Sequence, residues 1–142
     1  MKENLKKISE LIKKKDEINK KEFENTLTNF LHNHVKKNHV DEYIGGFPSI
    51  IEPVVFGKNV TLGEDVLLGP NVYIGDNSEI GDYNEISNTI ILDSVKLGEI
   101  FKLDKCIIAS DSKLNFTSLN VNNCIIEGKT SSNDTLDKKS FE

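Results

Sequence analysis

The sequence predicts a mainly β protein, a parallel β-helix of about four to five coils, with a pair of α-helices at its N-terminus. Two observations indicate the β-helix. Related segments recur after 17 or 18 residues, close to three hexads, as at Leu68, Ile86, Leu103 and Val121. Each hexad would form one side of a triangular coil, and its glycine would let the backbone turn the corner. The hexads themselves show an apolar residue followed by glycine at every sixth position: Phe56-Gly57, Leu62-Gly63, Leu68-Gly69, Ile74-Gly75 and Ile80-Gly81.

Residues 1–40 are expected to form a helical hairpin. Asn19, followed three residues later by Glu22, resembles a capping box at the start of the second helix. Two such short helices cannot form a core alone, so their apolar stripes must pack on the β-helix or on the same helices of another subunit. Apolar residues at helical spacing mark the two stripes: Leu5, Ile8, Leu11 and Ile12, then Phe23, Leu27, Phe30 and Leu31.

Three further segments complete the predicted organisation. Residues 41–49 are expected to be a linker, because Gly45-Gly46-Phe47-Pro48 breaks the helical period. Residues 50–128 are expected to form the β-helix, with coils stacked ~4.8 Å apart around one continuous core. Residues 129–142 are polar, with Leu136 and Phe141 as their only large apolar residues, and are expected to be a flexible tail.

The two cysteines are expected to be buried thiols. Aligning the later coils places Thr89, Cys106 and Cys124 at a small inward position, with the cysteines on adjacent coils. A disulfide needs Cβ atoms ~3.5–4.5 Å apart, slightly closer than the coil spacing allows. Free thiols that pack as small apolar groups are therefore favoured.

One outward column of the β-helix is apolar along its whole length. The equivalent columns on the other two faces are mostly charged or polar, so this column, the apolar stripe, is expected to be buried. The N-terminal helices of the same chain or an intersubunit interface would bury it, and the sequence leaves both open. The residues expected at such an interface are Val55, Tyr73, Ile90, Ile107 and Ile125 of the apolar stripe, with Leu27, Phe30 and Leu31 of the second helix.

Composition excludes several classes of protein. The chain has no run of 18 apolar residues, so no membrane span is expected, and the lysine-rich start lacks the apolar core of a signal peptide. Two cysteines and no leader favour a cytoplasmic protein.

Residues 1–40 carry a net charge of +4 and residues 41–142 a net charge of −9, with no arginine. An acidic β-helix without arginine argues against nucleic-acid binding.

Residues 50–128 resemble hexapeptide-repeat proteins, most closely the C-terminal β-helix of sugar-1-phosphate nucleotidylyltransferases. Pro53-Val54-Val55-Phe56-Gly57 and Leu68-Gly69-Pro70-Asn71-Val72 carry the resemblance, and Ile86-Ser87-Asn88-Thr89-Ile90-Ile91 is similar to a characteristic coil of that family. The resemblance implies a left-handed β-helix. In that family an N-terminal α/β domain performs nucleotidyl transfer, and here about forty helical residues stand in its place. The transferase chemistry therefore does not carry over, and no glycine-rich nucleotide loop occurs in the sequence.

Other hexapeptide β-helices are acyltransferases, which use a histidine as general base, or carbonic anhydrases, which hold zinc with three histidines. The only histidines here, His32, His34 and His39, precede the first predicted coil. His32 and His34 point to different faces of a helix, so they are poorly placed to share one ion. No catalytic residue, metal site or cofactor is therefore expected.

The function expected from these features is a non-catalytic oligomerisation or regulatory β-helix module in sugar nucleotide metabolism, acting as a homo-oligomer. A first alternative is a hexapeptide acyltransferase that transfers an acetyl group from acetyl-CoA to a sugar or amine, with one of the three histidines as base. A second is a docking subunit for a separate nucleotidyltransferase chain.

Overall fold

The computed structural model describes residues 1–40 and 42–142 and is mainly β, a parallel solenoid of about five turns with two N-terminal helices. The predicted fold class is thus confirmed. The helices are α1 (Lys2–Lys13) and α2 (Lys20–His34). The remaining elements are β1 (Ile44–Gly45), β2 (Ser49–Ile50), β3 (Val54–Phe56), β4 (Thr61–Leu62), β5 (Leu67–Leu68), β6 (Val72–Ile74), β7 (Glu79–Ile80), β8 (Glu85–Ser87), β9 (Thr89–Ile91), β10 (Lys96–Ile108), β11 (Lys113–Glu127), β12 (Lys129–Thr130), the 3-10 helix η1 (Asn133–Thr135) and β13 (Asp137–Ser140).

The strands stack into three faces, because each strand pairs in parallel with the strand one turn later. One face is β1-β4-β7-β10, the second is β2-β5-β8-β10 and the third is β3-β6-β9-β10. β10 and β11 are long enough to contribute to all three faces. Their register places Lys96 opposite Lys113, Leu103 opposite Val121 and Cys106 opposite Cys124. The 17- and 18-residue offsets read from the sequence are therefore the actual offsets between turns.

The interior of the prism is a continuous apolar core. Leu68, Ile74 and Ile108 have no exposed surface there, and Phe101 is 1% exposed. Thr89, Cys106 and Cys124 occupy the small inward position predicted for them. The two Sγ atoms lie 3.5 Å apart, much longer than a disulfide bond, so both cysteines are free and buried as expected.

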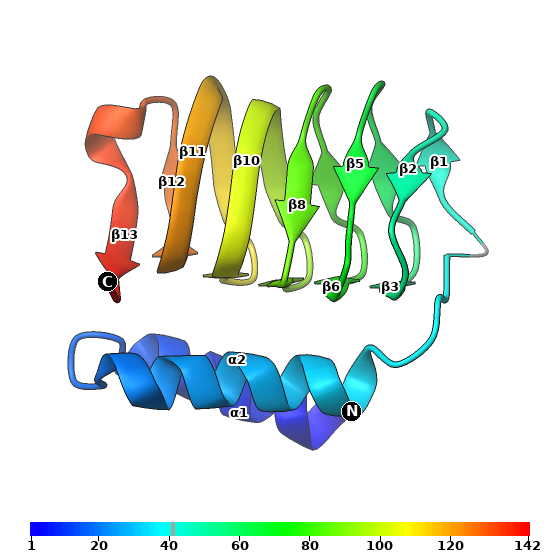
Figure 1. Cartoon of the computed structure of the whole chain (residues 1–142). Coiled ribbons are helices and arrows are strands. Elements are labelled where there is room, and N and C mark those ends of the chain that lie inside the picture. Colours follow the sequence, from blue (N-terminus) through cyan, green and yellow to red (C-terminus); the bar gives the residue numbers. More distant parts are fainter. Residues whose placement is uncertain (41) are drawn as a thin grey trace.

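The apolar stripe packs against the chain's own helices. Figure 1 shows α1 and α2 running along the solenoid on the side where β3 and β6 lie. The rings of Phe30 and Tyr73 meet edge to face, with centroids 5.5 Å apart, and Ile90 and Ile107 are completely buried in the same cluster. The described chain thus contains its own cover for the apolar stripe. Val55 stays half-buried, whereas another subunit cannot reach the other four side chains of the stripe while the helices stay in place.

The second helix begins where the sequence predicts. Asn19 is its N-cap, and its Oδ1 atom accepts a hydrogen bond from the backbone N–H of Glu22 at 2.9 Å. This bond satisfies one of the amide groups that a helix N-terminus leaves without a partner.

The segments before and after the predicted β-helix are structured as well. In the predicted linker, residue 41 lies outside the described residues, whereas β1 and β2 form the first turn by pairing with β4 and β5. Residues 129–142, expected as a flexible tail, instead form β12, η1 and β13. β13 pairs antiparallel with β11, and Phe141 is only 5% exposed. Phe141 and the half-buried Leu136, which packs against the core of the solenoid, therefore anchor this polar segment.

Most glycines of the hexads have a different role from the one expected, although Gly69 does have a positive φ, of 105°. Gly57 and Gly63 do not adopt a left-handed backbone; Asn59 and Asp65, two positions later, do so, with φ of 57° and 54°. A Cβ atom on Gly57 would lie 2.2 Å from the Oδ1 atom of Asp76 on the next turn. Glycine is needed at these positions because successive turns of the solenoid approach closely there. The backbone changes direction at the left-handed residue two positions later.

Candidate functional site

The candidate site is a groove between α2 and one corner of the solenoid. Leu27 and Leu31 of α2 are buried, because they face the apolar stripe. Glu24, Thr28 and His32 follow one another at intervals of four residues, so they share another side of the same helix. These three polar side chains form the helical wall of the groove.

A column of corner residues, one from each turn, forms the opposite wall. We call Asn71, Asn88, Lys105 and Asn123 the corner column. All four adopt a left-handed backbone, with φ between 48° and 61°. Asparagine visits this region more readily than most residues, because its short polar side chain can hydrogen-bond locally. Lysine at position 105 is the exception in the column.

Hydrogen bonds connect the amides of the corner column. Asn71 Nδ2 donates to Asn88 Oδ1 at 3.0 Å, and Asn88 Nδ2 donates to the carboxylate of Asp104, also at 3.0 Å. Asp104 accepts a further bond from the hydroxyl of Ser87 at 3.2 Å. The amide planes are therefore held in one orientation, which leaves further amide hydrogens and the Asn71 oxygen for another partner.

The groove encloses a cavity of about 330 Å³. Its floor is apolar, from Leu27 and Leu31, and its walls carry amides, a hydroxyl, an imidazole, a carboxylate and an ammonium group. The Glu24 carboxylate lies 3.8 Å from the ammonium group of Lys20. Among the described residues, Lys105 forms no ion pair. The groove therefore offers many hydrogen-bond donors and one uncompensated cation.

The three histidines singled out in the sequence do not converge. His32 lines the groove. His34 lies on another side of α2, with Nε2 2.5 Å from the amide nitrogen of Asn4, and its pKa is lowered because burial disfavours the charged imidazole and the N-terminus and Lys36 are positive nearby. His39 lies at the first turn, where its backbone pairs with Val55 and its side chain lines a separate cavity with Asp76. The described residues also contain no group of three or more His, Cys, Asp or Glu side chains that could hold a metal ion.

Asp76 and Asp82 have a structural role that the sequence analysis did not identify. The Asp76 carboxylate accepts a hydrogen bond from the backbone N–H of Lys58, and Asp82 does the same for Glu64, both at 2.8 Å. Asp93 repeats this contact one turn later with the N–H of Asp76. An aspartate 18 or 19 residues after a hexad glycine was the sequence signal from which this role could have been predicted.

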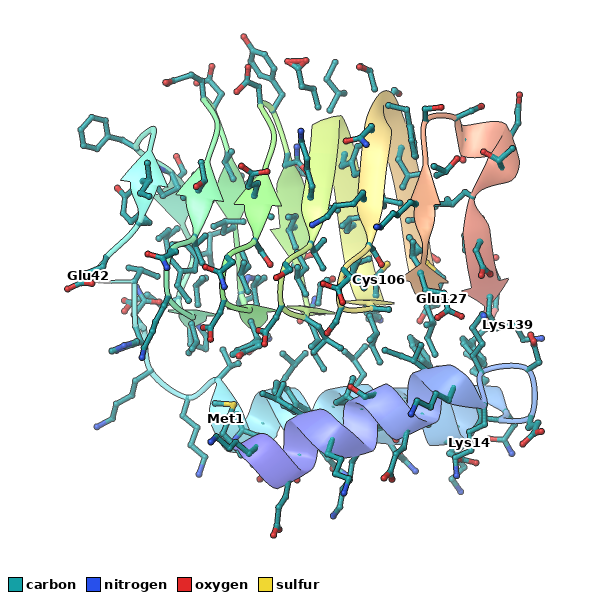
Figure 2. The ribbon with its side chains drawn as sticks, turned by 180° about the vertical axis from the view of Figure 1, so that it is seen from behind. Met1, Lys14, Glu42, Cys106, Glu127 and Lys139 are labelled. Carbon is teal, nitrogen blue, oxygen red and sulfur yellow. The ribbon has the colours of Figure 1, made fainter. Side chains whose placement is uncertain are left out.

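The two ends of the solenoid differ. β1 and β2 each pair with a strand on one side only, and large apolar residues surround them: Ile44 is 59%, Phe47 92% and Ile51 51% exposed. We call these three residues the first-coil edge. At the other end, β13 pairs with the last turn, and Glu127 lies on the side of the solenoid that faces the helical layer (Figure 2), where it forms an ion pair with Lys15. Sequence reasoning missed the first-coil edge, although a phenylalanine within a Gly-Gly-Phe-Pro turn was a signal.

Comparison with known proteins gives one match. The family model described as the GMPPB C-terminal domain matches residues 50–136, more than half of the chain. No curated protein and no solved structure matches the chain. Within the described residues, no helix combines the length and the apolar character needed to span a bilayer.

Proposed function

The chain belongs to the GMPPB C-terminal domain family, and on this premise we propose that it is a non-catalytic assembly module that self-associates. It is a module related to nucleotidylyltransferase tails, and it would act in sugar nucleotide metabolism in the cytoplasm. The observation that carries the assembly role is the first-coil edge, where Phe47 exposes 92% of its surface beside unpaired strand edges. Apolar groups this exposed are typical of surfaces that contact another protein.

A second copy of the chain is the occupant that best fits the first-coil edge. The three side chains are uncharged, so contacts between them in two copies involve no like-charge repulsion. β13 crosses the opposite end, which favours a head-to-head contact over head-to-tail stacking. A two-fold axis perpendicular to the solenoid would bring the same edge strand of both copies together in antiparallel orientation. The pairing of β13 with β11 is a precedent, within this chain, for an antiparallel strand on a solenoid edge.

Light scattering after size exclusion tests this proposal. The wild-type chain should have about twice the monomer mass of 16.0 kDa. Phe47→Ser should reduce the mass to that of the monomer while leaving the circular dichroism spectrum of the folded chain unchanged, because Phe47 makes little contact within the chain. Tyr83→Ser is the matched control, since this ring is also exposed, at 57%, but lies on another corner. A wild-type monomer, or a dimer unaffected by Phe47→Ser, would refute assembly through this edge.

A separate nucleotidyltransferase chain is the alternative partner for the same edge. The family membership favours it, because domains of this kind are related to nucleotidylyltransferase tails. Mixing the purified chain with a purified nucleotidyltransferase chain from the same cell distinguishes self-association from docking onto that chain. A 1:1 mixed complex that Phe47→Ser disrupts, in place of the homodimer, would favour the docking subunit.

The acyltransferase alternative has one observation in its favour, because His32 lines a groove beside the corner column. A histidine in such a position could act as a general base for a bound hydroxyl or amine. His32→Ala is the variant to assay for acetyl transfer from acetyl-CoA, with His34→Ala as the control on the same helix. Transfer by the wild-type chain that only His32→Ala abolishes would replace the non-catalytic proposal.

A further inference from the structure

We propose that the groove between α2 and the corner column binds a small hydroxylated anion, such as a sugar phosphate or a sugar acid. This ligand site is separate from the assembly role and does not depend on it. Its two walls come from parts of the chain that lie far apart in the sequence. Residues 24–32 provide one wall, and turns of the solenoid between residues 71 and 123 provide the other.

The groove is preformed, because aromatic contacts fix α2 against the solenoid toward both ends of the helix. Near the start of α2, the ring of Phe23 stacks on Phe141 with centroids 4.6 Å apart. Near its end, Phe30 packs edge to face on Tyr73. A ligand therefore does not need to organise these walls, and a preformed site lowers the entropic cost of binding.

The corner column supplies hydrogen bonds suited to hydroxyl groups. Asn71 and Asn88 are held by the bonds to Asn88 and Asp104, so their remaining amide hydrogens have fixed directions. Each neutral amide offers both donors and an acceptor, the combination that a row of hydroxyls requires. The carboxylate of Glu24 on the helical wall provides a stronger acceptor for a hydroxyl hydrogen.

Lys105 supplies the specificity for a negative charge. It occupies the corner position that asparagine takes on the turns before and after it, at Asn88 and Asn123. The nearby carboxylate of Asp104 is engaged by Ser87 and Asn88, and Lys105 forms no ion pair among the residues that the structure describes. An anionic group seated at Lys105 would form a charge-assisted contact while its hydroxylated body lies along the amides.

The size and floor of the groove agree with this class of ligand. A cavity of about 330 Å³ lies at the lower end of the range for small-molecule sites, which is roughly 300–1,000 Å³. The apolar surfaces of Leu27 and Leu31 can contact the C–H groups of a sugar ring. A single phosphorylated or oxidised monosaccharide has the required length and polarity.

Isothermal titration of the full chain tests the proposal with four probes. Glucose 6-phosphate and gluconate carry both features, whereas glucose lacks the charge and inorganic phosphate lacks the hydroxylated body. Glucose 6-phosphate or gluconate, or both, should bind at least about tenfold more tightly than glucose and inorganic phosphate do. Binding of neither, or equal binding of inorganic phosphate, would overturn the proposal.

Two lysine variants locate the binding. Lys105→Gln should weaken the binding at least about tenfold. Lys102→Gln should leave it unchanged, because this exposed lysine lies on the neighbouring face beside Glu85 at 3.4 Å. Side-chain amide signals of Asn71, Asn88 and Asn123 should shift in nitrogen–proton spectra on titration. Binding that Lys105→Gln does not alter, or shifts confined to other asparagines, would refute the groove as the site. The mass by light scattering reports assembly separately, so each proposal can fail alone.

Discussion

The ring of Phe141 stacks on the ring of Phe23, with centroids 4.6 Å apart and planes within 8° of parallel. This contact joins the end of the chain to the start of α2. Phe23 is completely buried and Phe141 is 5% exposed. Ion pairs lie at the same end, between Lys15 and the carboxylates of Glu127 and Asp137. The C-terminal segment therefore holds the helical layer against the last turn of the solenoid.

Phe141→Ala should lower the free energy of unfolding by about 3–5 kcal/mol, because it removes a buried aromatic ring and leaves a cavity against Phe23. Urea unfolding followed by circular dichroism measures this. The control is Tyr83→Ala, whose ring is 57% exposed and whose loss should change the stability by less than about 0.5 kcal/mol. A loss below about 1 kcal/mol for Phe141→Ala would mean that the stacking does not fix the helices.

Local periodicity explains why so much of the fold was predictable. The inward positions and the apolar stripe follow from a period that each turn repeats, so residues such as Tyr73 and Ile107 could be placed on one face directly. The burial of the stripe also followed, because a row of apolar side chains requires a cover. The sequence did not decide whether that cover comes from the same chain, since both arrangements place the same residues in contact.

The missed features depend on contacts that no local pattern records. The ordered C-terminal segment rests on two apolar residues, Phe141 and Leu136, and on the antiparallel pairing of β13 with β11. The groove depends on where the corner column meets α2, which no repeat specifies. His32 was singled out as a candidate base, but nothing in its own sequence context indicated the asparagines opposite it.

Gly57→Ala tests the close approach between turns. The added Cβ would lie 2.2 Å from Asp76 Oδ1 and 2.8 Å from the backbone nitrogen of Asp76. We expect a loss of about 1–3 kcal/mol in the free energy of unfolding, as for other overpacked sites. Asp76→Ala alone should also destabilise, by about 1.5–3 kcal/mol, because the N–H of Lys58 loses a charged acceptor.

The double variant Gly57→Ala/Asp76→Ala distinguishes a clash from a general loss of stability. Removing the carboxylate relieves the shortest contact, so the double variant should cost at least about 0.5 kcal/mol less than the sum of the two single variants. Strict additivity would contradict the proposed close approach. Glu99→Ala serves as a control, since this carboxylate is exposed and should contribute less than about 0.5 kcal/mol.

Cys106 and Cys124 should resist thiol reagents in the folded chain. Both side chains are completely buried, and the contact with the Cys124 sulfur together with burial raises the pKa of Cys106. Because the thiolate is the reactive form, labelling with a chromogenic disulfide should be at least about 100-fold slower than in denaturant, where both thiols should react. Ser110→Cys provides an exposed thiol that should label at once. Rapid native labelling of Cys106 or Cys124 would contradict their position in the core.

Tyr73 should make the protein less stable at high pH. Burial beneath the helices, with smaller effects from Asp93 and Asp76, raises the pKa of Tyr73 to about 12, whereas an exposed tyrosine ionises near 10. Between these values the unfolded chain releases a proton that the folded chain keeps, so the free energy of unfolding falls as the pH rises. The fall from this group is at most about 1.4 kcal/mol per pH unit.

Tyr73→Phe isolates this contribution, because it keeps the ring against Phe30 and removes the ionisable hydroxyl. The quantity to measure is the difference in unfolding free energy between wild type and variant, because the contributions of the groups that the two proteins share cancel in it. We expect that difference to be constant from pH 7 to about 9 and then to shift in favour of the phenylalanine variant up to pH about 12. A difference that stays constant across the whole range would mean that the hydroxyl ionises as freely in the folded chain as in the unfolded one. In that case the helices would not seal the apolar stripe at Tyr73.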